Sequence, residues 1–169
     1  GRQVDPPFTV NGLELVDTDG APYSLTADTD ERLTLVFFGY TNCPDICGLV
    51  LGNLASALTQ LDEADRDQVE VVFVTTDPAR DDEAAVRAYL DRYDPDFIGL
   101  TGELADIEQV ATSVAVGMGE KLPSGGYEVD AHTTTVTGID VDDQAPIYWS
   151  QTTSPGEFAA DIHTLLQED

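Results

Sequence analysis

Residues 33–47, LTLVFFGYTNCPDIC, decide the fold of this chain of 169 residues. Its first six residues, 33–38, form an apolar run of strand length, which is typical of a central strand covered on both faces. Residues 40–44 are predicted to turn, and from residue 45 apolar side chains recur at helical spacing as far as Leu61. The stretch therefore predicts a buried strand that leads through a cysteine-bearing turn into a helix.

The same patterns continue along the chain. Val69–Thr75 (VEVVFVT) predicts a second buried strand, and Asp81 or Asp82 is placed to cap a helix that runs to about Tyr93. The remaining pattern predicts a strand at 97–100, a helix at 104–116, a loop at 122–126, strands at 127–130, 134–140 and 146–150, and a last helix opened by the capping box SPGE at 154–157.

The segment before residue 33 predicts a hairpin. Residues 8–16 and 23–25 flank the turn sequence DTDG at 17–20, with glycine at the tight position. Residues 1–7 (GRQVDPP) are interpreted as a linker that leads into one domain covering 8–169. The element order predicts an α/β fold with a central mixed β-sheet flanked by helices and an N-terminal β-hairpin, which fits a thioredoxin-like fold.

The charge of the chain is strongly negative. Asp and Glu number 33 against 7 Lys and Arg, which gives a formal net charge of −26. A surface this acidic repels phosphate backbones and anionic headgroups. The composition therefore argues against nucleic-acid binding and against adsorption to an anionic membrane. The apolar content of 41% and its periodicity exclude disorder. We interpret the composition, with Lys121 as the single lysine, as halophilic adaptation, since at about 1 M salt the screening length is only about 3 Å.

The two cysteines form the main chemical feature. Cys43 and Cys47 stand in a CxxxC arrangement at the start of the predicted helix, where residues four apart are neighbours. The positive end of the helix is expected to lower the pKa of their thiols. Such a pair forms a disulfide or binds one soft metal ion, and a purely structural disulfide or two inert thiols is the alternative.

The remaining metal ligands of comparable strength are two histidines. A tetrahedral zinc site would need four ligands, whereas two thiolates and one imidazole suit copper, particularly Cu(I). His132 lies on a connection between two predicted strands. His163 lies inside the last helix beside its apolar stripe, where a histidine is most often simply solvated.

Three ordered motifs resemble the SCO/SenC family. Residues 38–47 (FGYTNCPDIC) are similar to the family signature FGYTxCPDxC, residues 76–81 (TDPARD) to its DPxRD segment, and residues 97–102 (FIGLTG) to its FxGLTG segment. The resemblance extends from about residue 8 to residue 166. A lone CxxxC is weak evidence, but three motifs in family order followed by a histidine are specific.

The resemblance implies a thioredoxin-like fold and one copper ion bound by Cys43, Cys47 and His132. The implied function is that of a copper metallochaperone in assembly of the dinuclear copper centre of a haem–copper (cytochrome c) oxidase. The copper-site subunit of that oxidase would be its partner, and a thioredoxin-like protein its reductant. Because such proteins are usually tethered, we expect a monomer on the extracytoplasmic side of the membrane, held by an N-terminal anchor outside this chain.

The chain departs from the family pattern at two places. Gly48 stands where the family often has proline, and Ala131 separates Asp130 from His132, which are adjacent in the family. Because successive residues of a strand point to opposite faces, the inserted residue is expected to change how Asp130 supports the histidine.

Two other functions use the same cysteines. A thiol–disulfide oxidoreductase would need one attacking and one resolving cysteine and no metal. A thiol peroxidase would also need a hydroxyl and an arginine, for which Thr41 and Arg80 are the candidates. Asp77 and Asp81 are candidate oxygen ligands for oxidised copper, although closing a strand and capping a helix are the stronger explanations for them.

Overall fold

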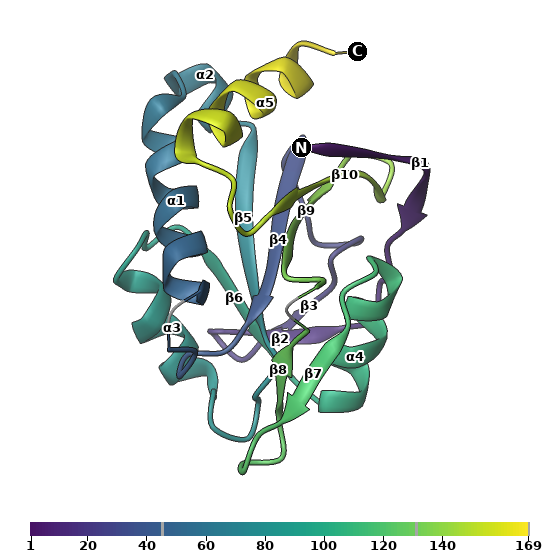
Figure 1. Ribbon diagram of the computed structural model, residues 1–169, viewed down its shortest axis with the longest axis vertical. Helices are drawn as coiled ribbons and strands as arrows, with labels where there is room; N and C mark the ends of the chain where they lie inside the picture. Colours follow the sequence, from purple (N-terminus) through teal and green to yellow (C-terminus); the bar gives the residue numbers. More distant parts are fainter. Residues whose placement is uncertain (45, 131, 169) are drawn as a thin grey trace.

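The computed structural model describes residues 1–44, 46–130 and 132–168, and its centre is an eight-stranded mixed sheet (Figure 1). Strands β4, β5 and β6 run parallel, and the other neighbouring pairs are antiparallel. In spatial order the strands are β1 (Arg2–Thr9), β10 (Gln144–Ser150), β9 (Thr135–Ile139), β4 (Leu33–Gly39), β5 (Val69–Thr75), β6 (Ile98–Thr101), β2 (Leu15–Asp17) and β3 (Pro22–Tyr23).

Helices cover both faces of this sheet, as the apolar central strands require. Side chains of β4 alternate between the two faces, so that Leu35 and Phe37 enter one core and Val36 and Phe38 the other. The first core is closed by α1 (Ile46–Gln60), α3 (Glu83–Asp91) and α5 (Pro155–Gln167), and the second by α4 (Leu104–Ser113). The short helix α2 (Glu63–Arg66) follows α1 and meets α5 at the end of α1 away from the cysteines (Figure 1).

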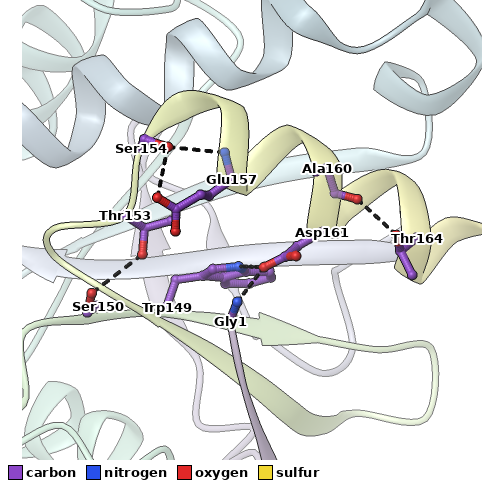
Figure 2. A network of polar contacts seen from close by, with 9 residues as sticks. All are labelled: Gly1, Trp149, Ser150, Thr153, Ser154, Glu157, Ala160, Asp161 and Thr164. Carbon is purple, nitrogen blue, oxygen red and sulfur yellow. Dashed lines mark hydrogen bonds and ion pairs between the residues drawn. The ribbon is translucent and has the colours of Figure 1, made fainter.

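The start of α5 confirms the predicted capping box. Ser154 Oγ accepts a hydrogen bond from the backbone N–H of Glu157 at 3.2 Å and donates to Glu157 Oε1 at 3.1 Å (Figure 2). One turn further, Asp161 Oδ2 accepts the indole N–H of Trp149 at 2.9 Å, which ties α5 to β10 (Figure 2). Helix α5 is therefore fixed at its first two turns.

The N-terminal segment differs from the sequence prediction. Residues 1–7 were expected to form a linker, but β1 begins at Arg2 and pairs with β10, with an irregularity between Gln3 and Phe8. Its two prolines are tolerated because β1 is an edge strand. The predicted hairpin is confirmed in a shorter form, β2–β3, with Gly20 in the left-handed region at φ +82°.

A second hairpin follows α4. Strands β7 (Met118–Lys121) and β8 (Tyr127–Val129) pair with each other, on either side of the loop predicted at 122–126. The sequence pattern missed β7, because it extended the preceding helix to residue 116 whereas α4 ends at Ser113. Across the described residues, no helix combines the length and the apolar character needed to span a bilayer.

Candidate metal site

The cysteines lie where β4 ends and α1 begins. The backbone N–H of Cys43 donates to the carbonyl of Tyr40 at 3.1 Å, which closes the turn after Gly39. Cys47 follows in the first turn of α1 and is only 3% exposed, whereas Cys43 is half-buried. Both are present as thiols. The strand–turn–helix arrangement predicted from residues 33–47 is confirmed.

The environment of Cys47 raises the pKa of its thiol. The largest cause is a hydrogen bond with the side chain of Cys43, and burial of the sulfur adds to it. The expected lowering of this pKa is therefore wrong, because the neighbouring thiol and burial of the sulfur outweigh the backbone hydrogen bond with Tyr40, which acts in the lowering direction. The hydrogen bond places the two sulfurs in contact, and a metal ion that binds both would displace their protons.

A pocket of about 360 Å³ opens beside the two cysteines. Its lining includes Tyr40 and both cysteines, together with Glu128 and Thr134. Burial raises the pKa of the Tyr40 hydroxyl to about 12, and the charges of Cys43 and Glu128 act in the same direction. Sequence reasoning missed Glu128, whose only signal was its place two residues before Asp130.

His132 is exposed and sits in a turn held by Asp130. The backbone N–H of His132 donates to Asp130 Oδ1 at 2.9 Å, and the hydroxyl of Thr134 donates to the Asp130 carbonyl at 3.0 Å. Asp130 thus supports the backbone of His132, which agrees with the expected change in its role. Ala131, which separates the two, lies outside the described residues.

The three candidate ligands are not assembled together. Within the described ranges, no group of three or more His, Cys, Asp or Glu side chains is arranged to hold a metal ion. The structure brings Cys43 and Cys47 into contact, and pocket residues Val129 and Thr134 flank the turn of His132 in sequence.

The candidate carboxylates Asp77 and Asp81 are both buried and bonded to other residues. Asp81 accepts hydrogen bonds from the backbone and hydroxyl of Thr41 and from the hydroxyl of Thr75. Asp77 Oδ1 accepts the hydroxyl of Ser124 at 2.6 Å. Both are about 1% exposed or less, and it is the neighbouring Asp82 that caps α3. These contacts favour the structural roles over direct metal binding.

His163 lies in a different place from the cysteines. Its Nδ1 is 2.5 Å from Asp65 Oδ2 of α2, a contact between residues 98 positions apart in the chain. That hydrogen bond and the charge of Asp65 raise the pKa of His163. The solvated position expected for His163 is confirmed, with an added partner that the sequence did not predict.

Thr41 and Arg80 are the two residues that a thiol peroxidase would need beside the cysteines. The Thr41 hydroxyl is bonded to the buried Asp81 at 2.5 Å, and Arg80 is exposed at the end of the turn 78–80 that precedes α3. This arrangement gives no support to peroxide activation at Cys47.

Comparison with known proteins identifies the family. The family model described as SCO1/SenC matches residues 2–167, so the chain belongs to the SCO1/SenC family. The mitochondrial protein SCO1 homolog of Homo sapiens is 33% identical over 160 residues, which cover 88% of this chain and 53% of that protein. The chain spans about half the length of the curated relatives it matches.

Solved structures agree with this assignment. ScoI of Bradyrhizobium japonicum, solved with copper bound, has a TM-score of 0.77 and 32% identity over 92% of this chain and 98% of that chain. Apo Sco1 of Thermus thermophilus has a TM-score of 0.83 and 27% identity over 98% of this chain and 95% of that chain. The predicted thioredoxin-like fold, a central mixed sheet flanked by helices, is confirmed.

Proposed function

We propose that this domain is a copper metallochaperone that binds one copper ion through Cys43 and Cys47, with His132 as the third ligand. The observation that supports this most strongly is the contact between two thiols beside a pocket, in a chain of the SCO1/SenC family. Thiolate sulfur and imidazole nitrogen are ligands that favour Cu(I) over harder cations.

The third ligand requires a movement of its turn. His132 is exposed, while residues 129 and 134 on either side of its turn line the pocket. We infer that copper bound to the two sulfurs draws the imidazole over the pocket. Ordering of this turn costs free energy and so weakens copper binding, which suits a protein that must release its metal.

The partner and location are proposed from the relatives. The human relative is named as mitochondrial, and the Bradyrhizobium structure contains copper. We propose assembly of the dinuclear copper centre of a haem–copper oxidase as the role, and the copper-site subunit as the partner. A thioredoxin-like protein would keep the thiols reduced. The domain would face the extracytoplasmic side of the membrane, held by an N-terminal anchor.

Titration with Cu(I) under reducing conditions tests the proposed ligands. We expect one tightly bound copper per chain for the unmodified protein, and a loss of at least about tenfold in affinity for Cys43→Ser, Cys47→Ser and His132→Ala. His163→Ala is the matched control, because this histidine contacts Asp65 on α2 rather than the pocket. Its affinity should equal that of the unmodified protein.

Salt separates specific binding from attraction to the acidic surface. With a formal charge of −26, the chain gathers cations at low ionic strength. At about 1 M salt the screening length falls to about 3 Å, so surface binding is suppressed. Equal stoichiometry at low and high salt is the expected result. Unchanged affinity in all three ligand variants would refute the model.

A second function is favoured by the contact between the sulfurs. As a thiol–disulfide oxidoreductase, the domain would reduce a partner disulfide to two thiols while Cys43 and Cys47 become a disulfide. The half-buried Cys43 would attack, since Cys47 is only 3% exposed and the pKa of its thiol is raised. Reduction of a disulfide in the partner's copper site, measured without copper, would distinguish this activity from copper delivery.

A further inference from the structure

Residues 75–81, which run from the end of β5 toward α3, contact both parts of the candidate metal site. Thr75, Thr76, Asp77 and Asp81 are all about 1% exposed or less, so this short segment holds four buried polar side chains. Buried polar groups are retained where their hydrogen bonds are satisfied. Their partners lie on the turn that bears Cys43 and on the β7–β8 hairpin that precedes His132.

Asp81 holds the cysteine turn. Its carboxylate accepts the backbone N–H of Thr41 at 2.9 Å and the Thr41 hydroxyl at 2.5 Å, two residues before Cys43. The Thr75 hydroxyl donates to the same carboxylate at 2.7 Å and links it to the end of β5. Hydrogen bonds to a carboxylate are stronger than those between neutral groups, so this contact fixes the turn at Thr41.

Thr76 holds the hairpin. Its hydroxyl donates to the Tyr127 carbonyl at 2.6 Å, and its own carbonyl accepts the Tyr127 N–H at 3.0 Å. Its backbone N–H donates to the Gly39 carbonyl at 2.7 Å, at the end of the strand that leads to the cysteines. Thr76 therefore joins the hairpin to the β4 end of the cysteine turn.

The packing of the hairpin against this segment is close. A Cβ built on Gly126 would lie 2.4 Å from Asp77 Oδ1 and 2.7 Å from Asp77 Cα, so only glycine allows the approach. Ser124 of the same hairpin loop donates to Asp77 Oδ1 at 2.6 Å. The hairpin is thus placed by residues 76 and 77 before the chain reaches His132.

We propose that residues 75–81 are the positioning element of the metal site. Asp81 sets the turn that presents Cys43, and Thr76 sets the hairpin that leads to His132. The proposal rests on the proposed function, since it assumes that these two parts act together on copper. Neither side chain touches the metal; each acts through the backbone that it holds.

Removal of each contact should therefore affect one part of the site. Asp81→Ala leaves the buried N–H of Thr41 and the hydroxyl of Thr75 without their acceptor. Thr76→Val keeps the shape of the side chain but removes the hydroxyl that donates to the Tyr127 carbonyl at 2.6 Å and, at a longer 3.3 Å, to the Gly39 carbonyl. Thr76→Ser retains that hydroxyl and is the conservative variant.

Asp82→Ala is the matched control for loss of stability alone. Asp82 is exposed, and its side chain caps α3 by accepting the Ala85 N–H at 2.8 Å. Its removal costs stability of the usual size for a helix cap without touching the cysteine turn or the hairpin. If Asp81→Ala does not fold, Asp81→Asn takes its place, because an amide keeps one accepting oxygen.

Two measurements test the proposal. We expect Asp81→Ala and Thr76→Val to weaken Cu(I) binding about 10- to 100-fold, and Asp82→Ala to change it by less than about twofold. Thr76→Ser should restore most of the affinity that Thr76→Val loses. In the metal-free protein, hydrogen exchange should accelerate at the Thr41–Cys43 amides only in the Asp81 variant, and at the hairpin amides 118–130 only in Thr76→Val.

The outcomes separate this proposal from the proposed function. If Asp82→Ala weakens copper binding as much as Asp81→Ala does, the effect is one of global stability and the positioning role is refuted. Uniform acceleration of exchange in both parts by either variant refutes it as well. If the unmodified protein binds no copper, the proposed function fails, and the pattern of hydrogen exchange alone confirms or refutes the positioning role.

Discussion

Gly39 lies directly beneath the sulfur of Cys47, and its replacement by alanine gives the sharpest test of the site geometry. The added methyl group would lie 2.8 Å from Cys47 Sγ and 3.1 Å from Phe73 Cε2. A third contact, with Phe37 Cε2, would be 3.4 Å. Both phenylalanines are fully buried, so the sulfur is the neighbour with most freedom to move.

The cost follows from overpacking of a dense core. Insertion of one methyl group into such a place costs about 1–3 kcal/mol of unfolding free energy. For a chain of this length each kcal/mol lowers the melting temperature by about 2–4 °C, so a decrease of roughly 2–12 °C is expected. A sulfur displaced from its place beside Cys43 would also bind copper less tightly, by about tenfold for each 1.4 kcal/mol lost.

Thermal unfolding and Cu(I) titration of Gly39→Ala measure the two effects, with Gly52→Ala as the matched control. Gly52 also lies near the cysteines in sequence, within α1, but a Cβ there would meet no described atom within 4 Å. Because alanine favours the helix interior, Gly52→Ala should stabilise the protein by about 0.5–1 kcal/mol and leave copper binding unchanged. A Gly39→Ala variant that matches the unmodified protein in both measurements would show that the sulfur is not placed as described.

Three further predictions concern the pocket and helix α5. Since the contact with Asp65 raises the pKa of His163, the pair stabilises the fold fully below pH of about 6.5 and loses this effect as the pH rises through the folded-state pKa. The urea midpoints of the unmodified protein and of His163→Gln should therefore differ less at about pH 8.5 than at about pH 5.5. These two assay values lie about one unit or more on either side of the unfolded-state pKa. A difference that stays constant would contradict this prediction. Glu128→Gln removes the pocket carboxylate and should slow Cu(II) association at low salt but not at about 1 M salt, and an equal salt dependence would count against it. Trp149→Phe removes the 2.9 Å hydrogen bond to Asp161 and should lower the unfolding free energy by about 2 kcal/mol in urea, with copper affinity as the negative control.

Elements whose formation depends on local sequence could be predicted closely. Val69–Thr75 forms β5 with the predicted bounds, and the capping box at Ser154 opens α5. In both, neighbouring residues determine the structure through apolar runs and side-chain caps. Strand β1 could not be predicted in this way, because its first residues pair with β10, about 145 positions away in the chain (Arg2 with Tyr148). Its sequence has the prolines of a linker, and only the partner strand makes it a strand.

The candidate site likewise has parts that the sequence predicts and parts that it does not. The turn that brings Cys43 and Cys47 together follows from a strand, a proline and a helix in succession, and the sequence predicts it. The raised pKa of Cys47 could not be predicted, since it depends on burial of the sulfur and on the orientation of its neighbour. The hairpin positions Glu128, and the β5–α3 loop positions Asp81. Their places near the cysteines therefore depend on tertiary contacts and not on local sequence patterns.

The unequal burial of the two sulfurs would give the proposed metal exchange a direction. Cys43 is half-buried at the pocket, whereas Cys47 is 3% exposed behind it. If copper binds as proposed, an incoming thiol would reach the site from the Cys43 side, so Cys43 would be the first ligand to be exchanged. Cys47, buried behind it, would be the ligand that retains the ion until the acceptor binds it.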